Sequence, residues 1–205
     1  MTKRLFKAQI EPLFERIERY LDAPERDLDG QLRAVREWIA LADNDPETFD
    51  RIMARLPACT PDWLFNLPAE LVDAGRVPEA QELAEVLDGM CAGTRSRAHL
   101  AVTLASRRDA AARPQIEMCR ARFPDDPWVR LKCGEALALL GLLHAAEREF
   151  RRALSVAGDD EFTIDVARDR LLEFLARAGR ADEARALSDA GSESCIAGVC
   201  ESVRA

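Results

Sequence analysis

The sequence predicts an all-α protein built from antiparallel helix hairpins, and three observations indicate this fold. Apolar residues recur at helical spacing along the 205-residue chain, with no competing alternation of the strand type. Glycines end several of these apolar runs, as they commonly do where a helix stops. A seven-residue phrase occurs twice, as AGRVPEA at residues 74–80 and as AGRADEA at residues 178–184. The repeated phrase indicates one structural unit that is used more than once.

The N-terminal segment, residues 1–58, is expected to be helical. Its apolar residues follow a helical period, namely Phe6, Ile10, Leu13, Ile17, Leu21, Leu28, Leu32, Val35 and Ile39. Asp45 before Pro46 and Thr60 before Pro61 each predict a helix start, because Asp and Thr are favoured N-caps and proline fits the first helical position. The segment has no repeat motif. It serves either as a cap or as a dimerisation element, through which a homo-oligomer would form.

Three glycines, Gly75, Gly141 and Gly179, mark the repeated unit. Each is followed five residues later by an alanine, at Ala80, Ala146 and Ala184. Glycine adopts the left-handed conformation without steric penalty and so ends a helix. A small residue near the start of the next helix lets the two backbones approach closely. We therefore interpret AGRxxEA as the turn of a helical hairpin.

A longer register connects successive hairpins. Leu100, Thr103, Ala112, Ile116 and Cys119 recur 34 residues later as Gly134, Leu137, Ala146, Phe150 and Ala153. With this pattern the chain resembles the tetratricopeptide family, whose 34-residue hairpin carries a glycine, a bulky residue three positions later and Ala-x3-Phe in its second helix. Residues 127–160 match best. They depart from the family pattern at Arg130 and Cys133, which stand in the Trp and Leu slots, and at Gly158 in place of the closing proline.

The resemblance implies a right-handed superhelical stack of hairpins over residues 59–190, preceded by the helical cap and followed by a flexible tail at residues 191–205. Stacking of three or more hairpins closes their apolar faces into one core and creates a concave groove. Pro114 requires that the second helix of its hairpin is kinked or begins later than the repeat suggests. The helix boundaries around Pro68 and Pro114 therefore stay open.

The first helix of each hairpin lines the concave side in this family, so steps of three or four residues select the candidate groove residues. They are Arg97, Leu104, Trp128, Leu131, Glu135, Asp169 and Glu173. Trp128 is the one large aromatic residue among them and fits equally well in the core between two hairpins. The family's carboxylate-clamp members grip a peptide C-terminus with Lys, Asn and Arg on these helices. No asparagine stands there in this chain, so chaperone C-terminal peptides are not expected as ligands.

Neighbouring stretches carry opposite charge. Residues 59–90 contain seven acidic residues against Arg76, a net charge of −6, and residues 91–123 contain seven arginines against Asp109 and Glu117, a net of +5. One interpretation is that these are solvated outer faces that attract each other weakly. The sharper hypothesis is that the arginine-rich hairpin, including Arg97 and Arg107, binds an acidic peptide.

Motifs for chemistry are missing from the sequence, which contains no P-loop, no dinucleotide-binding fingerprint, no nucleophile elbow and no HExxH. Cys119 and Cys133 fall on core positions of the repeat and are expected to act as packing residues. Cys195 and Cys200 supply only two ligands where zinc needs three or four, which leaves a redox or metal role in the tail open. We therefore expect no cofactor, no metal and no enzymatic activity. The alternative is an enzyme or enzyme-associated subunit whose site is not recognisable from sequence.

Composition restricts the partners. The net charge of −8 opposes indiscriminate binding to nucleic acid or to an anionic membrane, and no apolar stretch approaches membrane-spanning length. The N-terminus lacks an apolar signal segment, so we expect a cytoplasmic protein. Arginine outnumbers lysine 26 to 3, as is typical of a GC-rich bacterial source. The predicted function is a protein-interaction module or scaffold, adaptor- or chaperone-like, that binds a peptide or helix of another protein in its groove.

Overall fold

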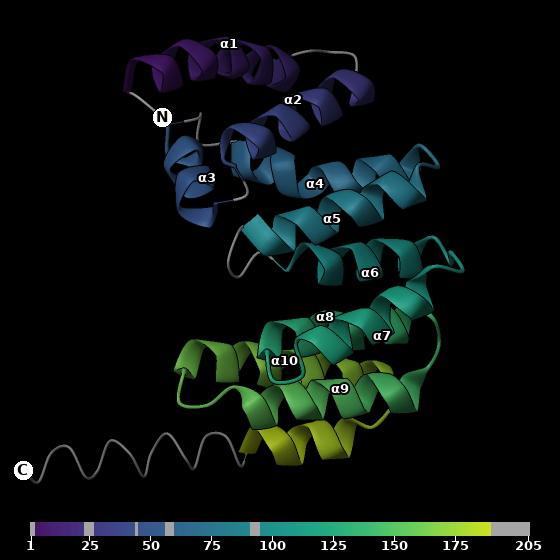
Figure 1. Ribbon diagram of the computed structural model, residues 1–205. Coiled ribbons are helices and arrows are strands. Elements are labelled where there is room, and N and C mark those ends of the chain that lie inside the picture. Colours follow the sequence, from purple (N-terminus) through teal and green to yellow (C-terminus); the bar gives the residue numbers. More distant parts are fainter. Residues whose placement is uncertain (1–2, 23–26, 44, 56–59, 91–94, 190–205) are drawn as a thin grey trace, which may run out of the picture. The chain divides into compact units, whose positions relative to one another are not determined.

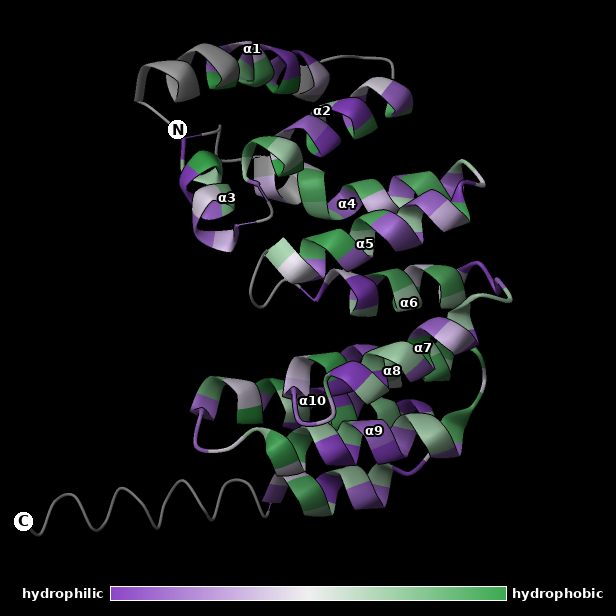
Figure 2. Ribbon diagram, in the orientation of Figure 1, coloured by the Kyte–Doolittle hydropathy of each residue, from purple (hydrophilic) through white to green (hydrophobic). Residues whose placement is uncertain are grey.

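The computed structural model describes residues 3–22, 27–43, 45–55, 60–90 and 95–189 (Figure 1). Every regular element in these ranges is a helix, which confirms the predicted all-α fold of helical repeats. The chain divides into two compact units, Met1–Thr103 and Leu104–Ala205. Hydrophobic and hydrophilic residues alternate along the helices of both units, as expected for helices that bury one face (Figure 2). The predicted tail at residues 191–205 lies outside the described residues.

The first unit contains α1 (Lys3–Asp22), α2 (Leu28–Leu41), α3 (Pro46–Met53), α4 (Thr60–Asp73), α5 (Val77–Met90) and most of α6 (Ser96–Ser106). Here α1 packs on α2 and α4, α3 packs on α5, and α4 and α5 form a hairpin. Trp38 of α2 stacks on Phe49 of α3 with ring centroids 4.5 Å apart, and both side chains are fully buried. The helices within residues 1–58 therefore share a compact unit with the hairpin that follows them.

The second unit contains α7 (Ala112–Arg122), α8 (Pro127–Leu139), α9 (Leu143–Val156), α10 (Glu161–Arg177) and a further helix at residues 181–189. Helices α8 and α9 form a hairpin, and α10 packs against both. A Cβ atom on Gly134 would lie 2.8 Å from the ring of Phe150, so the two helices approach to a distance that glycine permits. Phe150 in turn lies against Phe174 of α10, with ring centroids 5.3 Å apart.

The repeat positions of residues 127–160 are interior positions in the structure. Glycine and the four larger residues of the predicted pattern are all buried, namely Gly134, Leu137, Ala146, Phe150 and Ala153. The pattern thus reports helix packing: the glycine admits the phenylalanine ring, and the alanines line the same interface. This agreement supports the tetratricopeptide-like description of the hairpin.

The predicted glycine turns are present with the expected backbone conformation. Gly75, Gly141 and Gly179 have φ values of 76°, 75° and 75°. In each turn the next backbone N–H donates to the carbonyl five residues earlier, at 2.8 to 2.9 Å. These bonds, with the one from each glycine N–H to the carbonyl three residues earlier, form the Schellman motif that ends a helix.

A fourth turn of the same kind has no glycine. Between α6 and α7, Arg108 has φ 55°, and the Asp109 N–H donates to the Leu104 carbonyl at 2.9 Å. Arg108 N–H donates to the Ala105 carbonyl at 3.0 Å, which completes the motif. No glycine marks this turn in the sequence, because arginine occupies the left-handed position.

In both copies of the repeated phrase, the arginine forms ion pairs with a glutamate of the same turn and with an acidic residue of another helix. Arg180 pairs with Glu183 three residues later and with Glu147 of α9, at 2.6 Å from the Arg180 Nη1 to the Glu147 Oε2. Arg76 pairs likewise with Glu79, at 2.7 Å, and with Asp29 of α2, at 2.8 Å. The hydrogen bond from the guanidinium lowers the pKa of the glutamate carboxyl group in both turns. AGRxxEA is therefore a turn with its own ion-pair clamp.

Proline positions agree with the described helix starts. The Asp45 carboxylate accepts a hydrogen bond from the Thr48 N–H at 3.0 Å, with Pro46 at the first helical position. Helix α7 begins at Ala112 and holds Pro114 in its first turn, so the later start is the correct alternative for this hairpin. Pro68 lies inside α4, and the side chain of Thr60, the first residue of α4, lies outside the described residues. None of the described helices is long and apolar enough to cross a membrane.

Candidate functional site

Helices α8 and α10 lie next to each other in the second unit and are the first helices of successive hairpins. Trp128 near the start of α8 meets Phe162 near the start of α10, with ring centroids 6.0 Å apart. Farther along, the Arg170 Nε lies 3.7 Å from the Glu135 Oε1. The members of these pairs are 34 and 35 residues apart, at or within one residue of the 34-residue repeat length, so the two helices run parallel in repeat register.

Local sequence positions the aromatic pair at the helix starts. The Asp126 carboxylate accepts hydrogen bonds from the N–H groups of Trp128 and Val129, at 2.9 and 3.1 Å, and Pro127 occupies the first helical position. Trp128 is half-buried, whereas Phe162 is 68% exposed and is the most exposed large hydrophobic side chain of the described residues. An aromatic ring exposed beside a second ring is typical of a binding surface.

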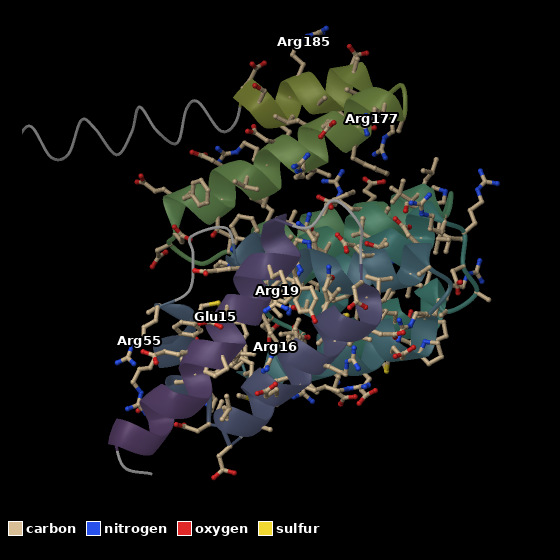
Figure 3. All side chains as sticks on the ribbon, turned by 90° about the horizontal axis from the view of Figure 1, so that it is seen from above. Glu15, Arg16, Arg19, Arg55, Arg177 and Arg185 are labelled. Atoms are coloured by element: carbon tan, nitrogen blue, oxygen red, sulfur yellow. The ribbon has the colours of Figure 1, made fainter. Side chains whose placement is uncertain are left out.

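A row of ion pairs continues from the aromatic pair along both helices. Glu135 accepts a hydrogen bond from Lys132 at 2.8 Å and faces Arg170. Glu173 pairs with Arg170 at 3.1 Å and with Arg177 at 2.7 Å; Figure 3 shows Arg177 near the C-terminal end of α10. The pairs of Glu173 are solvent-exposed and contribute little to stability singly, whereas the Lys132–Glu135 pair is partly buried. In this part of the face, each of these charged side chains therefore already has a partner of opposite charge.

Carboxylates without such partners lie at the start of α10, where Phe162 stands, and two turns farther along the helix. Asp159 and Glu161 flank Asp160 at the start of α10, and Asp169 lies seven residues after Phe162 on the same side of the helix. All three are exposed, and within the described ranges none has an ion-pair partner. The face of α8 and α10 therefore combines an aromatic pair with one exposed ring, a row of ion pairs and unneutralised negative charge. We call this surface the α8–α10 face.

The structure places the predicted groove residues in three different settings. Trp128, Glu135, Asp169 and Glu173 lie on the α8–α10 face and are at least partly exposed. Leu104 and Leu131 are in the interior, with 0% and 2% of their surface exposed. Arg97 is buried in the first unit, where its guanidinium pairs with Glu85 and its backbone N–H lies 3.4 Å from the Asp88 carboxylate.

Leu131 is buried, and not in the groove as predicted, because of its angular position around helix α8. A step of three from Trp128 reaches Leu131, which turns inward, whereas a step of four reaches Lys132, which stays on the face. Phe162 was missed, although it stands one repeat length, 34 residues, after Trp128. Extending the repeat register across that distance would have found it.

Two acidic residues of α5 pair with arginines of the first unit. Glu82 pairs with Arg36 of α2 at 3.3 Å, and Glu85 pairs with Arg97 of the basic stretch. The Glu85–Arg97 pair joins the acidic and basic stretches, and it occupies one of the two arginines in the acidic-peptide hypothesis. Arg107 is exposed in the turn after α6.

A buried carboxylate of the second unit, Glu149, lies between two arginines. Glu149 of α9 is 3% exposed and lies 2.7 Å from the Arg130 Nη1 and 3.0 Å from the Arg120 Nε. Cys119 and Cys133 are buried free thiols, as expected for packing residues. A hydrogen bond with Cys119, together with burial, raises the pKa of the Cys133 thiol, so Cys133 stays protonated and unreactive. In the described ranges no three His, Cys, Asp or Glu side chains gather into a metal-binding group. Cys195 and Cys200 lie outside those ranges.

Comparisons with known proteins add one structural likeness. No protein-family model matches the chain, and no curated protein matches it. Among solved structures, the chain is similar to "MamA 41-end from Desulfovibrio magneticus RS-1", with 17% sequence identity and a TM-score of 0.49. The match covers 90% of this chain and 94% of that one. At this identity and TM-score the likeness has no weight for function, and the description of the site depends on the contacts given above.

Proposed function

We propose that this protein is a protein-interaction module or scaffold that binds a peptide or helix of a partner protein on the α8–α10 face. The observation that carries the proposal is Phe162, an aromatic side chain that is 68% exposed and lies against Trp128. Aromatic side chains are enriched at the centres of protein interfaces, because they bury a large area at low conformational cost. An extended or helical segment laid along α8 and α10 would cover both rings.

Helical repeats support the proposal by analogy with other repeat proteins, whose stacked hairpins present extended binding surfaces. The parallel arrangement of α8 and α10 offers side chains from two hairpins to one segment. Glu173, which already pairs with Arg170 and Arg177, can exchange these partners for polar groups of a ligand at little cost, since exposed ion pairs are weak.

Quantitative affinity capture from the native host tests this function. The baits are the wild-type chain, Phe162→Ala, and the control Leu143→Ala, which removes a 50% exposed leucine at the start of α9. Both substitutions remove exposed apolar surface, so both variants are expected to fold normally. A partner that is retained by wild type and by Leu143→Ala and is lost with Phe162→Ala supports the proposal. Equal capture by all three baits contradicts it.

A further inference from the structure

We infer that the segment bound on the α8–α10 face is basic, with arginine or lysine side chains that contact Phe162 and the carboxylates around it. This inference rests on the proposed function and specifies the chemistry of the partner. It follows from the charge that surrounds the exposed ring, from the ion pairs that already use the cations nearby, and from the interactions that an aromatic ring offers to a cation.

The start of α10 is strongly acidic. Residues 157–169 contain five carboxylates, Asp159, Asp160, Glu161, Asp165 and Asp169, against Arg168, which gives a net charge of −4. The exposed position of Phe162 within this stretch means that a ligand covering the ring also approaches these carboxylates.

Cations of the chain itself leave part of this charge unneutralised. Arg168 pairs with Asp165 at 2.9 Å, and Lys132 on α8 pairs with Glu135 at 2.8 Å. Asp160 accepts a hydrogen bond from the Thr163 hydroxyl group. Asp159, Glu161 and Asp169 have no such partner within the described ranges, and they are available to a ligand.

Helix stability does not explain all three residues. Glu161 lies in the first turn of α10 and Asp159 directly precedes the N-cap, so both negative charges interact favourably with the helix dipole. Asp169 lies in the third turn, beyond the reach of that effect. Asp169 therefore has no role in starting the helix, and it lies on the same side of α10 as Phe162.

The combination of ring and carboxylates selects a cation. A guanidinium group stacks on an aromatic face and forms paired hydrogen bonds with a carboxylate. An ammonium group is also attracted to the ring and to the carboxylate, but as a point charge. An acidic segment would be repelled by Asp159, Glu161 and Asp169. An uncharged apolar segment would cover the ring but take water from the same carboxylates without replacing it, which is unfavourable. A basic segment satisfies both the ring and the charges.

Fluorescence anisotropy with three labelled peptides tests the inference on the full chain. The peptides are four repeats of Leu-Arg-Gln, four of Leu-Gln-Gln and four of Leu-Glu-Gln, which differ only in charge. The variants are Phe162→Ala, the pair Asp159→Asn with Glu161→Gln, and a control pair Glu47→Gln with Asp50→Asn on α3. The control pair removes two carboxylates as well, so it measures non-specific attraction of a cationic peptide to a chain of net charge −8.

The arginine peptide is expected to bind best, and Phe162→Ala is expected to weaken it about threefold to thirtyfold, the range for loss of a cation–π contact. The pair Asp159→Asn with Glu161→Gln should weaken binding and reduce its salt dependence, whereas the control pair should change it by less than about twofold. The inference is overturned if the control pair weakens binding as much as the acidic pair beside Phe162, or if the glutamate peptide binds as well as the arginine peptide.

The outcomes separate this inference from the proposed function. Tight binding of the glutamine or glutamate peptide that Phe162→Ala abolishes would overturn the basic partner and leave the α8–α10 face as a binding surface. Failure of all three peptides to bind in a Phe162-dependent way would also overturn the basic partner. The proposed function is then judged by the capture experiment alone, in which the partner is not chosen in advance.

Discussion

Replacing Arg108 by glycine is expected to stabilise the protein, because Arg108 occupies the left-handed position of a helix-ending turn. Its φ is 55°, whereas the corresponding residues of the three other turns are glycines with φ of 75° to 76°. A residue with a Cβ atom costs about 1–2 kcal/mol in this conformation. Glycine avoids that cost, but it also makes the unfolded chain more flexible. The added flexibility lowers the free energy of unfolding by about 0.4–1 kcal/mol. The net gain in free energy of unfolding is about 1 kcal/mol.

Urea denaturation followed by circular dichroism measures the effect, since the midpoint reports stability when the slope is unchanged. Gly141→Ala is the matched control. Nothing lies within 4 Å of a Cβ added at Gly141, so the substitution introduces only the backbone penalty, and we expect a loss of about 1 kcal/mol. If Arg108→Gly lowers stability, or if Gly141→Ala leaves it unchanged, the assignment of both turns to one conformation is wrong.

Three further predictions concern packing and charge in the second unit. Gly134→Ala should lower the free energy of unfolding by about 1–2 kcal/mol, because overpacking against Phe150 outweighs the better helix propensity of alanine; an unchanged or higher denaturation midpoint would contradict the close approach. Glu149→Gln should lower it by about 2–3 kcal/mol, since the change leaves two arginines without their buried counter-charge, and a loss below about 0.5 kcal/mol would show that the cluster is not a paired one. The hydrogen bond from Arg180 lowers the pKa of the Glu147 carboxyl group, so its contribution is present above the ordinary glutamate pKa and is lost as pH falls through the lower folded value. Thermal unfolding across that acidic range should depend less on pH in Arg180→Gln than in wild type, and identical pH profiles would refute the coupling.

Much of the fold followed from the sequence because the turns and the closest helix contact use residues that are chemically distinctive. Gly75, Gly141 and Gly179 stand where the backbone needs a positive φ, and Gly134 stands where a Cβ atom would meet Phe150. Such positions are readable in a single sequence, because no other residue type fits them as well. Arg108 is the exception: its turn has the same backbone conformation but no glycine, so the turn cannot be recognised from a glycine in the sequence.

The site was less readable, because exposure depends on the packing of neighbouring hairpins. A step of three placed Leu131 on the predicted surface, yet the structure buries it and leaves Lys132 partly exposed in its place. Arg97 belongs to an arginine-rich stretch by sequence, but it pairs with Glu85 inside the first unit. Phe162 lies in an acidic helix start that resembles many others, and only its contact with Trp128 reveals it as part of a surface.

Site-specific photocrosslinking in the native host tests whether the α8–α10 face binds a partner protein. A photoreactive p-benzoylphenylalanine is placed at position 162, on the α8–α10 face, and in a control chain at position 143. We expect a covalent adduct with a partner protein from position 162 and none of the same mass from position 143. No adduct from position 162, or the same adduct from both positions, would contradict the claim that this face binds the partner.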